Sequence, residues 1–174
     1  MNQHLLDFLI QVTSTVIGGS LLTIFFFLAK EKLFRLPQLS GLWTLDSTTA
    51  LSSYKPYVQM KLTYVLLLAQ QGNTIDGTGE KVKEVSLAGE KNYTGKQRTQ
   101  ITIRGYINKR YLSKDRVVFH IQEDGQLRKS SSVYSFSFTN KDFMIGTFIS
   151  TVAASEGTAQ CTRGNNQYFS PGKL

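Results

Sequence analysis

The chain has 174 residues, of which 20 are Lys or Arg, 12 are Asp or Glu and one is cysteine, and its formal net charge is +8. This length allows one domain with a hydrophobic core in addition to a membrane segment, and a lone cysteine excludes an internal disulfide scaffold. The positive excess favours an anionic partner such as a nucleotide, a nucleic acid or a lipid headgroup, although it also serves solubility.

The first predicted element is a membrane helix. Residues 8–29 read FLIQVTSTVIGGSLLTIFFFLA and contain no formally charged side chain. A helix of this length spans about 33 Å, enough to cross the hydrocarbon core of a bilayer. No basic region precedes the apolar run, so we interpret it as a retained anchor in the inner (plasma) membrane rather than as a cleaved signal peptide.

Three cations set the expected orientation of this anchor. Lys30, Lys32 and Arg35 directly follow the apolar run, and the positive-inside rule places that end in the cytoplasm. We therefore expect a single-pass protein with its N-terminus outside. Residues 1–35 form the anchor and basic juncture, and residues 36–174 form a cytoplasmic β-barrel domain.

Small residues in the middle of the helix suggest a surface for self-association. Ser14 and Gly18 are four positions apart and Gly19 follows, a spacing that lets two helices approach closely in a membrane. We expect a homo-oligomer that packs through these three residues. A lone anchor that tolerates small residues is the alternative.

Beyond the anchor, apolar residues alternate with polar ones, which is typical of strands with one buried face. In QITIRGYI, for example, Ile101, Ile103 and Ile107 alternate with Arg104 and Tyr106. Turn sequences separate the runs, and residues 85–97 are predicted to be a polar loop. The predicted strands cover residues 40–48, 57–70, 73–84, 98–108, 115–122, 129–139, 142–150 and 155–163. We predict an all-β fold, an antiparallel barrel of about eight strands, with a β-sandwich as the alternative.

The sequence offers little catalytic chemistry. His120 and Cys161 are the only histidine and cysteine of residues 36–174, too few for a zinc site. In GNTIDGTGEK, Thr78 stands where the phosphate-binding loop of nucleotide-hydrolysing enzymes requires lysine. We expect no enzyme, no cofactor and no metal, and we expect Cys161 to pack among apolar side chains.

Binding is then the function that the residues favour. Cationic and aromatic residues are interleaved on several predicted strands, where guanidinium groups pair with phosphate and aromatic rings stack on bases. An outward solvated face would use the same residue types. The candidate ligand-binding residues are Trp43, Tyr64, Lys81, Arg104, Tyr106, Arg116, His120, Arg128 and Thr147.

The order of these parts resembles a known family. An N-terminal membrane segment, a basic juncture, LSGLW at the start of a barrel and IGTFISTVAASEGTAQCTR near its end are similar to the membrane-anchored β-barrel effectors of bacterial cyclic-oligonucleotide antiphage signalling. The matching positions are Gly41, Trp43, Gly146, Thr147, Gly157 and Arg163. Better-known members carry two membrane helices, whereas this sequence has one.

The resemblance implies an effector whose barrel binds a cyclic di- or oligonucleotide and controls helix oligomerisation and disruption of the inner membrane. Its partners would be that ligand, the lipid bilayer and further copies of the chain, with no duplex nucleic acid. Two alternatives remain open. Gly41-x-Trp43 also occurs in lipocalin-like barrels, in which the tryptophan plugs one end and the ligand is a lipid or another apolar molecule. The second alternative is an interaction module of a membrane complex.

Overall fold

The computed structural model describes residues 3–33, 36–110, 113–125 and 128–164. The chain divides into two compact units, Met1–Arg35 and Leu36–Leu174. The first contains one helix, α1 (Gln3–Leu33), in which Leu5–Ala29 is long and apolar enough to cross a membrane. Of the three cations that set the expected orientation, Lys30 and Lys32 belong to α1 and Arg35 lies outside the described residues.

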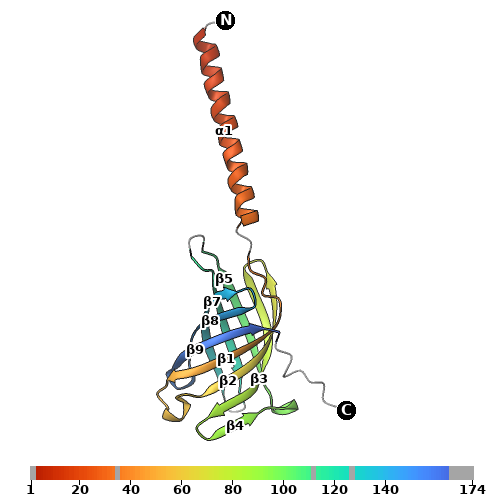
Figure 1. The fold of residues 1–174 in the computed structure, drawn as a ribbon, viewed down its shortest axis with the longest axis vertical. Helices are drawn as coiled ribbons and strands as arrows, with labels where there is room; N and C mark the ends of the chain where they lie inside the picture. Colours follow the sequence, from red (N-terminus) through yellow and green to blue (C-terminus); the bar gives the residue numbers. More distant parts are fainter. Residues whose placement is uncertain (1–2, 34–35, 111–112, 126–127, 165–174) are drawn as a thin grey trace. The chain divides into compact units, whose positions relative to one another are not determined.

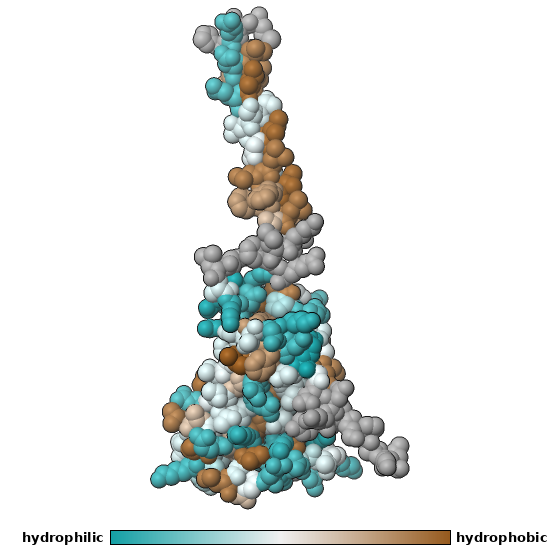
Figure 2. Space-filling view, in the orientation of Figure 1, coloured by the Kyte–Doolittle hydropathy of each residue, from teal (hydrophilic) through white to brown (hydrophobic). Residues whose placement is uncertain are grey.

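The polar residues of α1 are accommodated within the helix itself. The hydroxyl groups of Thr13, Thr15 and Thr23 donate hydrogen bonds to the carbonyl oxygens four residues earlier, at 2.6, 2.9 and 2.8 Å. These hydroxyls therefore need no water, which lowers the cost of placing them in a bilayer. The helix surface is most hydrophobic toward its C-terminal end, where the phenylalanines lie (Figure 2).

The second unit is a closed antiparallel β-barrel, as the alternating sequence predicts. Eight strands run up and down around the ring, each paired with its neighbours, and the first strand pairs with the last to close it (Figure 1). This continuous pairing excludes the alternative of a sandwich. The eight strands of the ring are β1 (Gly41–Leu51), β2 (Lys61–Gln71), β3 (Thr74–Ser86), β5 (Thr99–Asn108), β6 (Arg116–Asp124), β7 (Lys129–Asn140), β8 (Phe143–Ser150) and β9 (Ser155–Arg163).

A ninth strand corrects the expectation of a loop at residues 85–97. Strand β4 (Gly89–Asn92) pairs with the end of β3, at Lys83–Ser86, and forms a hairpin beyond the ring. All four of its residues are exposed and none is a large apolar residue, so the sequence lacks the apolar alternation by which strands are predicted. We call residues 84–98 the flap.

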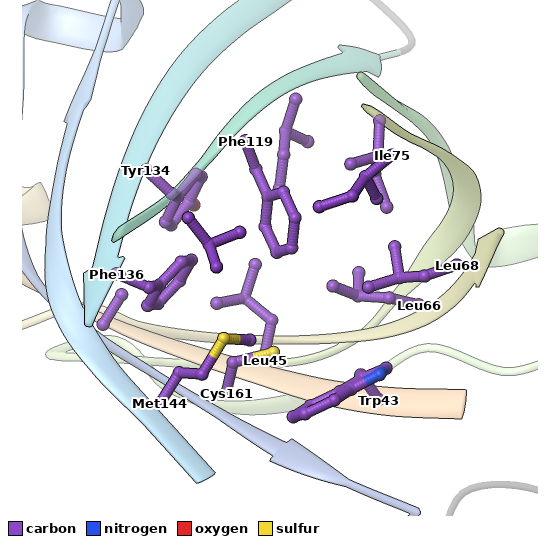
Figure 3. Packing of buried hydrophobic residues seen from close by; sticks show 14 of the residues in the cluster. Trp43, Leu45, Leu66, Leu68, Ile75, Phe119, Tyr134, Phe136, Met144 and Cys161 are labelled. Atoms are coloured by element: carbon purple, nitrogen blue, oxygen red, sulfur yellow. The ribbon is translucent and has the colours of Figure 1, made fainter. Parts of the chain in front are cut away.

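Apolar side chains from the strands of the ring form a buried cluster inside the barrel. Figure 3 shows the inward-pointing residues, among them Phe119, Phe136 and Met144, which are fully buried. The rings of Phe119 and Phe136 meet edge to face, with centroids 5.7 Å apart. Cys161 packs in this cluster, as expected, and burial raises the pKa of its thiol. The inward positions alternate along the strands except in β3, where a register shift against β2 places both Lys81 and Glu84 on the inside.

One end of the barrel, which we call the closed end, is sealed by Trp43. Its indole is fully buried and its Nε1 donates a hydrogen bond to the carbonyl oxygen of Leu39, at 2.8 Å. The guanidinium of Arg163 lies over the indole, 4.5 Å from the ring centre, and Nη1 donates to the carbonyl oxygen of Ser40 at 2.9 Å. The Nε atom of Arg163 also pairs with Asp142 at 3.0 Å. The first and last strands are thereby joined where the chain enters the barrel.

Substitution of Gly146 is expected to separate two strands. A Cβ atom at this position would lie 2.0 Å from the carbonyl oxygen of Ser135 and 2.8 Å from the Cα atom of Phe136. Because backbone atoms cannot yield as a flexible side chain does, Gly146→Ala should lower the free energy of unfolding by about 1–3 kcal/mol. The measurement is urea unfolding of the full chain in detergent micelles, followed by fluorescence of Trp43, the sole tryptophan.

The neighbouring Thr147→Ala is the matched control. The Thr147 side chain is exposed on the outside of β8, so its removal should change stability by less than about 0.5 kcal/mol. Equal stability of Gly146→Ala and wild type would contradict the close strand approach.

Candidate ligand-binding site

The other end of the barrel, the open end, holds a cavity of about 590 Å³. It lies where the connections β1–β2, β3–β5, β6–β7 and β8–β9 meet, opposite the end that Trp43 seals. A volume of this size is within the range for sites that take small organic molecules. Its wall is formed by Thr49, Tyr57, Met60, Leu62, Tyr64, Lys81, Glu84, Lys91, Tyr93, Gln97, Thr99, Glu123, Gly125, Arg128, Ser130, Ser132, Tyr134, Phe148, Ser150, Val152 and Ser155.

Aromatic rings form the floor of this cavity. Tyr134 on β7 and Phe148 on the adjacent β8 are stacked, with ring centroids 5.3 Å apart and planes 23° apart. The Tyr134 ring also stacks on Phe136, which belongs to the buried core. Tyr134 and Phe148 are only 3% and 6% exposed, so packing holds them in place and they form a rigid apolar boundary at the bottom of the cavity.

Three hydrogen-bonded side chains, two of them charged, lie in the cavity wall. The ammonium of Lys81 on β3 pairs with Oε1 of Glu123 on β6 at 2.8 Å, and the hydroxyl of Tyr64 on β2 donates to Oε2 of Glu123 at 3.1 Å. Burial, with the nearby Tyr134 and Glu123, raises the pKa of Tyr64 well above its usual range, so its hydroxyl stays protonated and keeps donating. We call Tyr64, Lys81 and Glu123 the inner polar triad.

The flap carries a second group of polar residues over the mouth. The Tyr93 hydroxyl donates to Glu84 at 3.0 Å, and the ammonium groups of Lys81 and Lys91 lie 5.3 and 4.9 Å from the centre of the Tyr93 ring. Burial and the hydrogen bond to Glu84 raise the pKa of Tyr93 to about 12. Arg98 anchors the base of the flap, since it donates to the Tyr93 carbonyl and pairs with Glu80.

The net charge of the cavity wall differs between the inner polar triad and the mouth. The wall contains three cations and two carboxylates. Lys81 lies close to both carboxylates, at 2.8 Å from Glu123 and 3.9 Å from Glu84. The remaining two cations, Lys91 and Arg128, belong to the flap and to the β6–β7 connection and have exposed side chains. The positive excess of the site therefore lies near its mouth.

The structure brings together three of the nine residues proposed from sequence. Tyr64, Lys81 and Arg128 line the cavity. Trp43 is buried at the closed end and does not line it. The other five are on the strands but their side chains point outward and are exposed to solvent, so we leave them out of the candidate site: Arg104, Tyr106, Arg116, His120 and Thr147.

These five side chains point outward because of their positions in the alternation of inward and outward residues along each strand. Ile103 and Phe119 point inward, so their neighbours Arg104 and His120 must point out. The cationic residues were chosen for their chemistry, but an unpaired guanidinium inside a barrel would lose its hydration at a large cost.

Sequence reasoning missed most of the cavity wall. Glu123 was detectable, because it continues the inward series of Val117, Phe119 and Ile121 and interrupts it with a carboxylate. Tyr134, which points inward with Phe136 on β7, was not among the proposed site residues. Tyr93 and Lys91 gave no signal, since they lie in the segment predicted as a loop.

The cavity wall combines aromatic and polar side chains. Across the described residues, no group of three or more His, Cys, Asp or Glu side chains is placed to hold a metal ion. The thiol of Cys161 is in the core and does not reach the cavity. What the wall supplies is a stacked aromatic floor, a charged hydrogen-bonding triad and cations at the mouth.

Comparisons with known proteins agree with this description of the fold. No protein-family profile matches the sequence, and no curated protein is significantly similar to it. The structure of EF1p2_mFAP2b bound to DFHBI is similar at a TM-score of 0.52 and 8% identity, over 72% of this chain and 94% of that one. A de novo designed fluorescence-activating β-barrel has a TM-score of 0.48 at 13% identity, covering 72% and 94%, and a redesigned β-barrel has 0.49 at 12%, covering 73% and 92%. The class of protein is thus a small closed β-barrel with a ligand-sized cavity at one end.

Proposed function

We propose that this protein is a membrane-anchored β-barrel that binds a small organic ligand in the cavity of its open end. The observation that carries the proposal is the cavity itself, about 590 Å³ with aromatic and hydrogen-bonding groups on the same wall. A barrel that served only as a packed scaffold would gain stability by filling this space with apolar side chains. The solved complex of EF1p2_mFAP2b with DFHBI supports it, since a barrel of similar fold holds a small molecule.

The wall favours a flat, partly polar ligand over a purely apolar one. A lipid chain would leave the remaining donors of Lys81 and the remaining acceptor positions of Glu123 unpaired in a dry cavity, and such desolvation is costly. A flat ring bearing polar groups stacks on the aromatic floor and leaves the charged groups bonded. This distinguishes the proposal from the lipid-carrying alternative.

Thermal unfolding of the full chain in detergent micelles tests the proposal. Fluorescence of Trp43, whose ring lies outside the cavity, reports unfolding of the barrel. The Tm is taken from the midpoint of the transition, so energy transfer to a coloured ligand changes the intensity but not the result. The panel is DFHBI, lumiflavin, guanosine, cyclic di-GMP and cyclic di-AMP. A ligand at 100 times its Kd should add about 2.7 kcal/mol, which raises the Tm by about 5–10 °C. If no member changes the Tm, the proposed function is wrong.

A second candidate is the effector function that the family resemblance implies, with a cyclic di- or oligonucleotide as ligand. Lys91 and Arg128 at the mouth favour it, because two cations beside an aromatic cavity suit phosphate groups next to a base. Lys91→Ala with Arg128→Ala should weaken cyclic di-GMP at least tenfold and leave the neutral lumiflavin unchanged. Equal weakening of both ligands would argue against phosphate contacts at the mouth.

The proposed association of α1 leads to a separate prediction. A Cβ atom on Gly18 or Gly19 would meet nothing within 4 Å, so the helix itself has room for a larger side chain. Gly18→Leu should therefore insert normally, fold its barrel and bind ligand, but it should block close helix packing. We expect crosslinked oligomers in membranes to fall at least fivefold. Val16→Leu, on the face of α1 opposite Ser14 and Gly18, is the control, and an unchanged oligomer yield for Gly18→Leu would exclude this surface.

A further inference from the structure

The geometry of the inner polar triad favours some flat molecules over others, according to the hydrogen-bonding groups on their edges. Lys81 and Glu123 come from strands that flank β5, and both side chains line the cavity with exposed fractions of 15% and 18%. The two charged ends are therefore within reach of a ligand while most of each side chain is covered. Such a pair presents a hydrogen-bond donor and an acceptor side by side.

The hydrogen bonds within the triad leave capacity on both members. Glu123 accepts one bond from Lys81 on Oε1 and one from Tyr64 on Oε2, whereas a carboxylate has about four acceptor positions. The ammonium of Lys81 has three donors, and Glu84 at 3.9 Å is too far for a hydrogen bond. Tyr64 holds the carboxylate from the opposite side, which limits the directions in which Glu123 can turn.

This arrangement matches one kind of ligand edge. In a lactam or imide ring the carbonyl oxygen and the adjacent N–H nitrogen are held about 2.3 Å apart on one side of the ring by the planar amide. The protein groups are 2.8 Å apart, so the oxygen can accept from Lys81 while the N–H donates to Glu123. Both bonds involve a charged partner, which makes them stronger and more selective than neutral ones.

We infer that Lys81 and Glu123 are the specificity-determining contacts of the cavity and that they recognise the adjacent carbonyl and N–H groups of a flat lactam or imide heterocycle. The inference rests on the proposed function, because it names the ligand class of that same site. The ring plane of such a ligand stacks on Tyr134 and Phe148, and its substituents extend toward the mouth. Tyr64 acts as a positioning residue through its bond to Glu123.

Paired ligands that differ by one methyl group test this inference. Lumiflavin and guanosine each carry the N–H beside a carbonyl, and 3-methyllumiflavin and 1-methylguanosine lack it. Equilibrium dialysis against the full chain in micelles, with empty micelles as the blank, gives each Kd. We expect the parent compound to bind about 10- to 100-fold more tightly than its methylated partner, the loss expected for a bond to a charged group.

Substitutions separate hydrogen bonding from steric exclusion of the methyl group. Glu123→Gln keeps the shape, and Glu123→Ala makes room for the methyl group and removes the acceptor. In Glu123→Ala the preference for the parent compound should fall to within about threefold, and the methylated ligand should bind at least as well as it does to wild type. In Glu123→Gln the amide oxygen still accepts but carries no charge, so the preference should fall by about threefold to tenfold. Tyr64→Phe should reduce the preference in part, because Glu123 is then less firmly oriented.

The outcomes divide clearly. If DFHBI binds and neither lumiflavin nor guanosine does, or if the methylated ligands bind wild type as tightly as their parents, the inference is wrong and the proposed function stands. A preference that persists in Glu123→Ala would also overturn it. If no ligand of the panel binds, the proposed function itself fails. Should Glu123→Ala not fold, as judged by Trp43 fluorescence, the comparison of wild type with Glu123→Gln decides.

Discussion

Replacement of Trp43 by alanine is expected to lower the free energy of unfolding by about 3–5 kcal/mol, the loss typical of a buried tryptophan or phenylalanine truncated to alanine. The indole is fully buried, donates to Leu39 and lies under the guanidinium of Arg163. Its removal opens a cavity at the closed end and leaves Arg163 without the ring that it covers. A loss of this size is a large share of the stability of a small domain.

The measurement is urea unfolding of the full chain in micelles, followed by near-ultraviolet circular dichroism of the tyrosines. This signal remains when the sole tryptophan is removed, and α1 contains no tyrosine. Trp43→Phe is the control: it keeps most of the buried volume and loses the hydrogen bond to Leu39, so about 1–2 kcal/mol should be lost. A Trp43→Ala protein within about 1 kcal/mol of wild type would contradict the sealing role.

Filling the cavity is expected to abolish ligand binding without loss of the fold. Ser132 on β7 lines the cavity, where its hydroxyl donates to that of Ser150 at 2.9 Å. Ser132→Phe places a ring in the space that a ligand needs, next to the aromatic floor. The affinity for whichever panel member raises the Tm of wild type should fall at least about 100-fold, equivalent to about 2.7 kcal/mol. Equilibrium dialysis measures it.

The same substitution on the outside of the strand is the control. Ser135 lies on β7 but faces away from the interior and does not line the cavity, so Ser135→Phe should bind as wild type does. Ser130→Phe, also in the cavity wall, replaces Ser132→Phe if that variant does not fold. Wild-type affinity in a folded Ser132→Phe protein would show that the ligand binds elsewhere.

The sequence by itself was sufficient for the architecture. A long uncharged apolar run predicts a helix able to span a membrane, and strict alternation predicts strands with one buried face. Both are found, as α1 and as the eight strands of the ring. The apolar residues of the predicted alternation in QITIRGYI, Ile101, Ile103 and Ile107, are all buried. These are local properties, set by residues close together in the chain.

Only the tertiary structure decided where the cavity lies and which residues line it. Trp43 and Tyr64 both point inward, yet one seals the closed end and the other lines the open end. Which end stays open depends on how side chains from all eight strands fill the interior together, and no single strand contains that information. Lys81 and Glu123 are likewise far apart in sequence and meet at 2.8 Å because the ring brings β3 and β6 to either side of β5. Outward residues such as Arg104 have suitable chemistry for binding, but water solvates a lone charge better than the interior of a barrel does, and this difference places them outside.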